Sequence, residues 1–194
     1  MQVQISEKIR IIRQHRGLTQ KQLGVALGYG ENDADNRIRK YELNIRTPRE
    51  DVVAKLAAVL RVNRINFISL ESGSLENIMQ TLFWLEEGNP GLVKLFSLEK
   101  NPRKKTAELN SEPAENDVFA KYDDSDYWPA HSPVGVWFNN RQLDDFLREW
   151  KLRKDELRAK EITREEYFEW KLNWPFTCDG MENSKSYISW RGAR

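Results

Sequence analysis

Side chains that could catalyse a reaction or bind a metal ion are few in this 194-residue sequence, and they are widely separated. The two histidines, His15 and His131, lie in different regions, and there is a single cysteine, Cys178. The sequence contains no H-x-x-x-H, C-x-x-C, G-x-S-x-G, G-x-G-x-x-G or P-loop motif. It therefore shows no signature of a zinc site, a serine nucleophile or a nucleotide-binding loop. The sequence therefore predicts no catalytic site, no metal site and no cofactor.

Paired carboxylates are the remaining candidates for acid–base catalysis. Asp144 and Asp145 are adjacent in sequence, as are Glu165 and Glu166, and adjacent residues of a helix point to different faces. We interpret them as solvated surface groups, and an enzyme is not expected. The single cysteine also excludes an intrachain disulfide framework. The lack of such a framework is typical of a protein in a reducing, cytoplasmic setting.

Charge and aromatic residues are unevenly distributed along the chain. Residues 1–70 contain 13 Lys and Arg against 7 Asp and Glu, whereas residues 71–194 contain 18 against 23, together with all seven tryptophans. This division favours two separately built parts, of which the basic one is typical of a module that meets a polyanion. No apolar run approaches about 18 residues and the polar N-terminus shows no secretory signal, so no membrane association is expected.

Residues 1–70 show the periodicity and capping signals of a compact helical domain. Thr19 and Gln22 form a capping box for the second helix, and Thr47 is expected to cap the fourth. Gly17 and Gly28 suit the left-handed conformation that ends a helix. The expected helices lie within residues 6–17, 19–28, 33–44, 47–60 and 63–70. The predicted fold of this part is a five-helix bundle.

The same residues carry a family resemblance. Four motifs occur in order within residues 5–70: G-L-T-Q, L-x-x-x-L-G, I-x-x-Y-E and R-T-P. With this order the segment resembles the XRE/Cro/phage-repressor family of helix-turn-helix transcriptional regulators. The resemblance implies binding to double-stranded DNA, with the third helix in the major groove. One departure is the turn after Gly28, which is several residues longer than is usual in the family.

The resemblance also nominates functional residues. Four positions of the third helix are expected to contact bases: Asp35, Asn36, Arg39 and Lys40. Arginine and asparagine suit this role because they form bidentate hydrogen bonds with guanine and adenine. Three residues are expected to contact phosphates: Gln20, Arg46 and Arg49. Arg13 and Glu42 match positions that form an internal ion pair in the family. For the basic residues of the third helix, the alternative interpretation is an ordinary solvated surface.

The remaining residues predict a smaller α+β region that ends in a helical hairpin, so the fold class of the whole chain is mainly α. We expect a helix and a strand in residues 71–98, a flexible acidic loop in 99–133, a strand and the hairpin in 134–175, and a disordered tail in 176–194. The two strands are placed at residues 92–99 and 133–138. The hairpin resembles the SHOCT type, and the order of elements resembles the C-terminal region of XRE regulators from Gram-positive bacteria.

The leading functional hypothesis is a sequence-specific transcriptional regulator, a repressor, that reads DNA with the helix around residues 35–41. Its C-terminal half would form a homodimer, sense a signal, or do both. Five apolar residues are the candidates for the dimer interface, with packing against the two strands of their own subunit as the alternative: Leu143, Trp150, Leu157, Tyr167 and Trp170. A second hypothesis is an antitoxin-like protein whose C-terminal half binds a protein partner, and a third is an enzyme with a borrowed DNA-binding domain.

Overall fold

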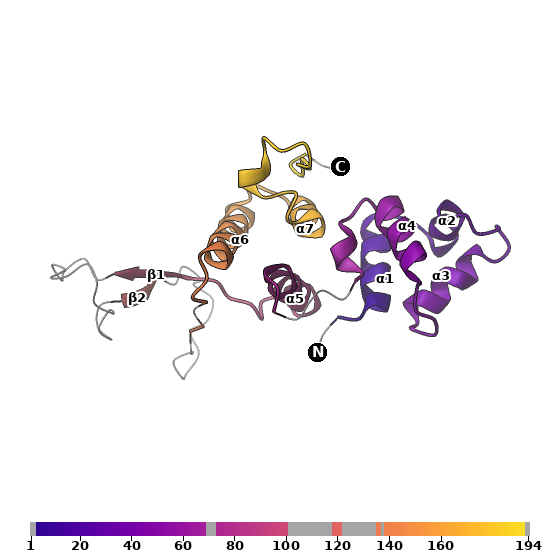
Figure 1. The fold of residues 1–194 in the computed structure, drawn as a ribbon, viewed down its shortest axis with the longest axis horizontal. Coiled ribbons are helices and arrows are strands. Elements are labelled where there is room, and N and C mark those ends of the chain that lie inside the picture. The colour runs from indigo at the N-terminus through magenta and orange to yellow at the C-terminus, as the bar shows by residue number, and fades with distance from the viewer. Residues whose placement is uncertain (1–2, 69–72, 101–117, 122–134, 137, 193–194) are drawn as a thin grey trace. The chain divides into compact units, whose positions relative to one another are not determined.

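The described part of the chain is mainly α-helical, as predicted (Figure 1). The computed structural model describes residues 3–68, 73–100, 118–121, 135–136 and 138–192. The α-helices are α1 (Ile5–His15), α2 (Gln20–Ala26), α3 (Ala34–Glu42), α4 (Glu50–Leu60), α5 (Leu75–Gly88), α6 (Arg141–Ala159) and α7 (Arg164–Asn173). Two short 3-10 helices are η1 (Arg64–Asn66) and η2 (Asp179–Met181).

The chain divides into two compact units. One consists of Met1–Val93 together with Arg153–Arg194, and the other of Lys94–Leu152. The first unit therefore contains α1 to α5, α7 and the end of α6. The charge and aromatic distribution suggests a boundary near residue 70, but the structure places the segments on either side of that position in the same unit.

Local signals set the ends of the first helices. Thr19 and Gln22 form the predicted capping box, in which each side chain accepts a hydrogen bond from the main-chain N–H of the other residue. Gly17 has a φ of 64°, the left-handed conformation predicted after α1. The predicted cap at Thr47 is wrong, because α4 begins after Arg49, whose extended backbone immediately precedes the first turn.

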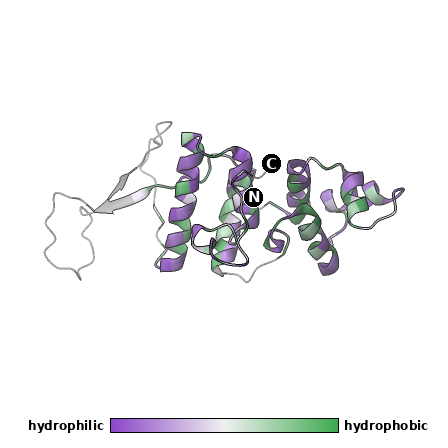
Figure 2. Ribbon diagram, turned by 90° about the horizontal axis from the view of Figure 1, so that it is seen from above, coloured by the Kyte–Doolittle hydropathy of each residue, from purple (hydrophilic) through white to green (hydrophobic). Residues whose placement is uncertain are grey.

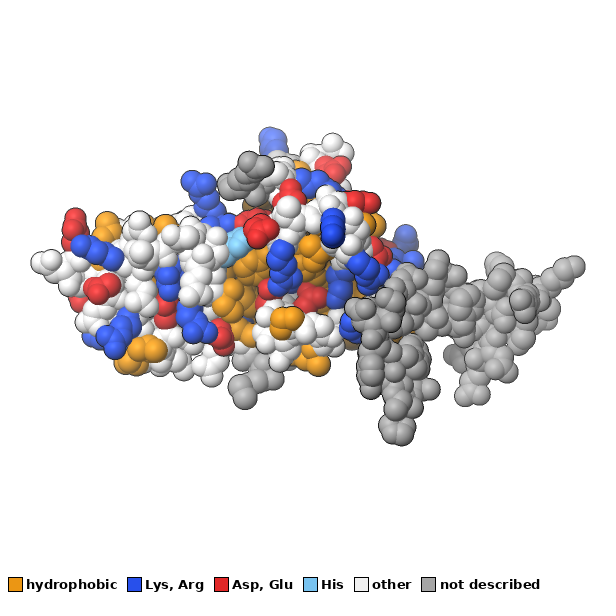
Figure 3. Space-filling view, turned by 180° about the vertical axis from the view of Figure 1, so that it is seen from behind, with side chains coloured by type: hydrophobic (Ala, Val, Ile, Leu, Met, Phe, Trp, Pro, Cys, Tyr) orange, Lys and Arg blue, Asp and Glu red, His pale blue; other side chains and the backbone are white. Residues whose placement is uncertain are grey.

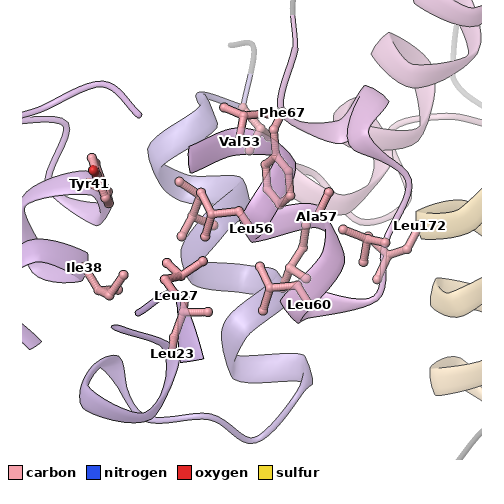
Figure 4. Close-up of a cluster of buried hydrophobic side chains, with 14 of the residues drawn as sticks. Leu23, Leu27, Ile38, Tyr41, Val53, Leu56, Ala57, Leu60, Phe67 and Leu172 are labelled. Atoms are coloured by element: carbon pink, nitrogen blue, oxygen red, sulfur yellow. The ribbon is translucent and has the colours of Figure 1, made fainter. Parts of the chain in front are cut away.

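Helices α1 to α4 enclose one hydrophobic core (Figure 4). Each helix contributes fully buried side chains: Ile9, Ile12, Leu23, Ile38, Leu56 and Leu60. Figure 2 shows hydrophobic and hydrophilic segments alternating along the helices, which is expected when one face of each helix is buried. The periodicity in residues 1–60 therefore predicted these four helices correctly.

The segment predicted as a fifth helix, residues 63–70, contains only the short helix η1 in its described part. Asn63 Oδ1 accepts a hydrogen bond from the N–H of Ile65, which closes a tight turn. The Asn63 N–H and Asn66 Nδ2 both donate to the carbonyl of Leu172, and Asn63 Nδ2 donates to the carbonyl of Trp174. The predicted five-helix bundle is therefore four α-helices and a turn that is held by the C-terminal part of the chain.

Helix α7 completes the core of the N-terminal helices. Phe168 and Leu172 of α7, with Trp84 of α5, belong to the same hydrophobic cluster as the side chains of α1 to α4. Residues 167–174 are all buried, so most of α7 is enclosed, whereas its first residues, Arg164 and Glu165, are exposed. The helical hairpin predicted in residues 134–175 corresponds to α6 and α7, but its second helix is part of the interior.

Two residues expected at a dimer interface lie inside this interior. Tyr167 and Trp170 are 1% and 0% exposed. The ring centroid of Trp170 lies 5.3 Å from that of Phe83 and 6.3 Å from that of Tyr167. These two residues therefore pack within their own subunit, but against α5 and each other and not against the strands that the alternative interpretation named.

A buried ionic network joins α5, α6 and α7. Glu86 accepts hydrogen bonds from Lys171 Nζ at 3.0 Å, from Lys154 Nζ at 2.7 Å and from the Tyr167 hydroxyl at 2.7 Å. Burial alone would raise the pKa of Glu86, but these partners outweigh it and lower the pKa to about 2. The carboxylate is therefore charged and compensated, which is the condition under which a buried charge is tolerated.

The two strands form an antiparallel ribbon, β1 (Ser97–Lys100) and β2 (Val118–Lys121). Both predicted strands need correction. The first begins at residue 97 instead of 92, and the described residues of segment 133–138 are not in a strand. β2 lies in the predicted acidic loop, residues 99–133, most of which falls outside the described residues. Four-residue strands are too short to show the alternation on which the prediction relied.

The tail, residues 176–194, is folded as far as residue 192, so its interpretation as disordered is wrong. Trp190 is 1% exposed, and the N–H of Ile188 donates to the carbonyl of Phe176. The guanidinium groups of Arg153 and Arg191 lie 5.2 and 4.5 Å from the centre of the Trp190 ring. Trp190, together with the buried Thr177 and Cys178, anchors a segment that lacks helical periodicity.

Candidate nucleic-acid interface

Helices α2 and α3 pack unusually closely at one point. Gly24 of α2 is buried against Ala34, the first residue of α3. A β-carbon added to Gly24 would lie 2.4 Å from the Ala34 carbonyl oxygen and 2.8 Å from its β-carbon, closer than real atoms approach. Only glycine permits this contact, and the contact fixes where the N-terminus of α3 begins relative to α2.

The base-contact candidates all lie on the exposed side of α3. Ile38 and Tyr41 point into the core, with 0% and 4% of their surface exposed. The four candidates are exposed: Asp35, Asn36, Arg39 and Lys40. The structure thus gives α3 a polar outer face on a helix whose inner face is fixed.

Arg13 and Glu42 form the ion pair that the family resemblance implied. Arg13 Nε donates to Glu42 Oε1 at 2.6 Å and Nη2 to Oε2 at 3.1 Å, with only 11% and 4% of the two side chains exposed. Arg13 Nη1 also donates to the carbonyl of Leu18. Gln20, a phosphate-contact candidate, donates from Nε2 to Glu42 Oε2 at 2.7 Å. These contacts tie α1, the start of α2 and the end of α3 into one rigid body.

Arg46 and Arg49, the other phosphate-contact candidates, stand in the segment between α3 and α4 and are exposed. The Arg46 N–H donates to the carbonyl of Lys40, so the segment folds back on the end of α3. Figure 3 shows basic and acidic side chains interspersed over one face of the molecule. The described residues on that face therefore form no continuous basic patch.

Sequence reasoning missed one basic residue of α3, Arg37. Its Nε donates to Asp33 Oδ2 at 2.5 Å, and its guanidinium carbon lies 4.8 Å from the centre of the Tyr29 ring. The hydroxyl of Tyr29 is 3.2 Å from that of Tyr41. Burial and this hydrogen bond raise the pKa of Tyr29 to about 12. We call Tyr29, Asp33, Arg37 and Tyr41 the Arg37 cluster. The spacing of four residues between Asp33 and Arg37 was the sequence signal that could have revealed the ion pair in it.

A second group of charges links α1 to α7. His15 Nε2 lies 2.8 Å from Glu169 Oε1, and Arg16 Nη2 donates to Glu169 Oε2 at 3.0 Å. Arg16 Nε also donates to the carbonyl of Leu60 at 2.7 Å. Burial alone would raise the pKa of Glu169, but His15 and Arg16 outweigh it and lower the pKa. The charges are mutually satisfied, so this group acts as a structural joint.

A groove of about 950 Å³ opens beside this joint. Ala54 and Ala58 of α4 form part of one wall, and Ile188 and Trp190 of the C-terminal segment form part of the other. Arg61, at the end of α4, also lines the groove and is exposed. The groove exists because α4 presents small side chains where larger ones would fill the space.

The described residues contain no group of three or more His, Cys, Asp or Glu side chains that could hold a metal ion. None of the helices in the described ranges is both long and apolar enough to cross a membrane.

Comparison with known protein families gives one match, to a helix-turn-helix family, which covers residues 9–65. The match contains α2, α3 and α4 and most of α1. The residues after it are unassigned, so the resemblance of the C-terminal region to regulators of Gram-positive bacteria stays a prediction. Comparisons with curated proteins and with solved structures found no match.

Proposed function

We propose that this protein is a sequence-specific transcriptional regulator that places α3 in the major groove. The proposal rests on residues 9–65, which are a helix-turn-helix domain of the XRE/Cro type, a type of domain that binds DNA. The observation that carries this proposal is the exposed polar face of α3 on a helix that Gly24 and the Arg13–Glu42 pair hold rigidly. A rigid support matters because hydrogen bonds to base edges require an accurate position of the donor groups.

The side chains on this face match the hydrogen-bonding groups of base edges. Arg39 is suited to guanine and Asn36 to adenine, each through two hydrogen bonds. Lys40 can donate to guanine, and Asp35 can accept from the amino group of cytosine. These four residues are the proposed base contacts.

Phosphate contacts orient such a domain on the duplex without reading its sequence. Arg46 and Arg49 are exposed beside α3 and are the proposed basic contacts. Gln20 already donates one amide hydrogen to Glu42, and its second hydrogen is the one we assign to a phosphate oxygen. Gln20 would then connect the internal ion pair to the DNA backbone.

We further propose that two copies act together as a repressor. One domain reads only a few base pairs, so a dimer on a palindromic site with half-sites about 34 Å apart is needed for useful specificity. Tyr167 and Trp170 are buried within the chain, so the contact between copies must use other surfaces. A dimer bound to an operator that overlaps a promoter would exclude the polymerase, which is the repressor role that we propose.

The deciding experiment is selection of binding sites from random duplexes with the full-length protein. We expect an enriched palindrome, and Arg39→Ala and Lys40→Ala each weaken binding to it by about 1–3 kcal/mol. Arg46→Ala and Arg49→Ala weaken binding to every duplex and reduce the salt dependence, by about 0.9 in slope for each phosphate that the variant no longer neutralises. If no sequence is enriched and the protein binds no duplex at all, the proposed function is refuted.

The partner-binding hypothesis has less support. It required the aromatic C-terminal half to be free to bind another protein, whereas Tyr167, Trp170, Trp174 and Trp190 are each at most 1% exposed. Purification of the full-length chain from its host, followed by mass measurement of the intact complex, separates the hypotheses. A stoichiometric second protein would favour the antitoxin-like alternative.

The groove beside α4 favours a second function, the sensing of a small molecule. Its volume of about 950 Å³ lies in the range of ligand sites, and it combines apolar walls with the exposed guanidinium of Arg61. We assign to it an organic anion with a flat apolar body. A ligand there would touch both α4 and the C-terminal segment, so it could alter how the domain is held.

A matched pair of dyes tests this assignment. Anilinonaphthalene sulfonate carries an anionic group, and N-phenylnaphthylamine has the same aromatic body without it. We expect saturable binding of both, which Ala58→Trp abolishes, and a loss of about threefold to fivefold for the anionic dye alone in Arg61→Ala. Equal effects of Arg61→Ala on both dyes would exclude the anion, and unsaturable binding would exclude the site.

A further inference from the structure

Arg37 lies on the same stripe of α3 as two proposed base contacts. Residues 33, 36, 37 and 40 follow the spacing i, i+3, i+4 and i+7, which places them along one side of a helix. Asn36, Arg37 and Lys40 are all exposed. A duplex that reaches Asn36 and Lys40 therefore also meets Arg37.

The Arg37 cluster leaves one edge of the guanidinium group free. Asp33 takes the Nε hydrogen and the Tyr29 ring covers one face, whereas no hydrogen bond within the described part of the chain uses Nη1 or Nη2. Tyr29 is itself linked to Tyr41, which is anchored in the core. These contacts favour one orientation of the two free nitrogens, so less side-chain entropy is lost when they bind.

Charge favours a base over a phosphate as the partner of this free edge. Asp33 and Arg37 together carry no net charge, so the pair gains little from a phosphate and releases few counterions. The Asp33 carboxylate also repels phosphate oxygens at short range. The O6 and N7 atoms of guanine are uncharged acceptors at the spacing of two arginine nitrogens.

We infer that Arg37 is a specificity-determining residue that reads a guanine through Nη1 and Nη2, with Asp33 and Tyr29 as its positioning residues. The inference rests on the proposed function, and it assigns a role to the long turn between α2 and α3, because that turn supplies both positioning residues. The turn between α2 and α3 then contributes to base recognition.

Binding-site selection with Arg37→Lys and Asp33→Asn of the full-length protein tests the inference. Lysine keeps the charge but cannot form the bidentate pair, so we expect the preference for guanine at one position of each half-site to fall at least about fivefold. Asp33→Asn frees the arginine to bind a phosphate, so we expect a weaker guanine preference and a salt slope steeper by about 0.9.

The pair Asp144–Arg148 on α6 supplies a matched control. Arg148 Nε donates to Asp144 Oδ2 at 2.7 Å with the same spacing of four residues, outside the helix-turn-helix domain. We expect Asp144→Asn to leave both the selected sequence and the salt slope unchanged. Thermal unfolding of each variant checks that the fold is retained, since exposed pairs of this kind contribute little stability.

Three outcomes would overturn the inference. An unchanged consensus in Arg37→Lys, with discrimination still lost in Arg39→Ala, would refute the role of Arg37 and leave the proposed function standing. A salt slope that falls by about 0.9 in Arg37→Ala would make Arg37 a phosphate contact. Absence of any selected site for the unmodified protein would refute the proposed function and this inference together.

Discussion

Replacement of Gly24 by alanine tests the α2–α3 contact most directly. The added β-carbon would lie 2.4 Å from the Ala34 carbonyl oxygen, and ordinary contact begins at 3.4 Å, so α3 must move by about 1 Å. Overpacking costs about 1–3 kcal/mol, and the upper part of this range applies because a main-chain atom cannot rotate away. Alanine recovers about 1 kcal/mol through its better helix propensity, which leaves a net destabilisation of about 2 kcal/mol.

Urea unfolding of the full-length protein, followed by circular dichroism, measures this loss. Gly30→Ala is the matched control, because a β-carbon there meets no atom within 4 Å and the residue has no left-handed φ. DNA affinity of Gly24→Ala should fall at least about tenfold, since a hydrogen bond lengthened by 1 Å is lost. Equal stability and equal DNA affinity of the Gly24→Ala and Gly30→Ala variants would refute the argument.

Three further predictions follow from the packing. A double-mutant cycle on Arg13 and Glu42 in denaturant should give a coupling above about 1 kcal/mol, because both side chains are mostly buried; a value near zero would mean that solvent screens the pair. A fragment of residues 1–70 should unfold less cooperatively and at a lower temperature than the whole chain, because it lacks Trp84, Phe168 and Leu172; equal melting curves would contradict this. The depressed pKa of Glu86 contributes stability that is present above the unfolded value of 4.5 and is lost as the pH falls towards 2, by about 3 kcal/mol; Glu86→Gln should flatten the pH dependence of the free energy of unfolding in this window.

Local sequence signals predicted the first four helices well. The capping box of Thr19 and Gln22 and the apolar spacing around Ile38 and Tyr41 depend only on neighbouring residues, so they are visible without the fold. The outward placement of Arg39 follows from the same spacing. The exposed face of α3 could therefore be predicted, including the residues proposed to contact bases.

The features that the sequence did not reveal depend on distant partners. Glu169 and Lys171 have the appearance of surface residues, yet they are buried because His15, Arg16 and Glu86 compensate their charges. A helix with such residues on several sides shows no apolar stripe, so its enclosed position could not be inferred. Arg37 is an intermediate case: its spacing from Asp33 is visible in the sequence, but the Tyr29 ring is brought over it only by the folded turn.

The place of α7 in the core has a consequence for synthesis of the protein. A chain leaves the ribosome from its N-terminus, and Leu172 is made more than 100 residues after Leu60, although the two side chains share one core. At about 5–20 residues per second, α1 to α4 wait for several seconds before their last packing partners exist. A product that ends early lacks these partners altogether. Chains cut short by premature termination are therefore expected to be less stable, and degraded faster, than completed molecules.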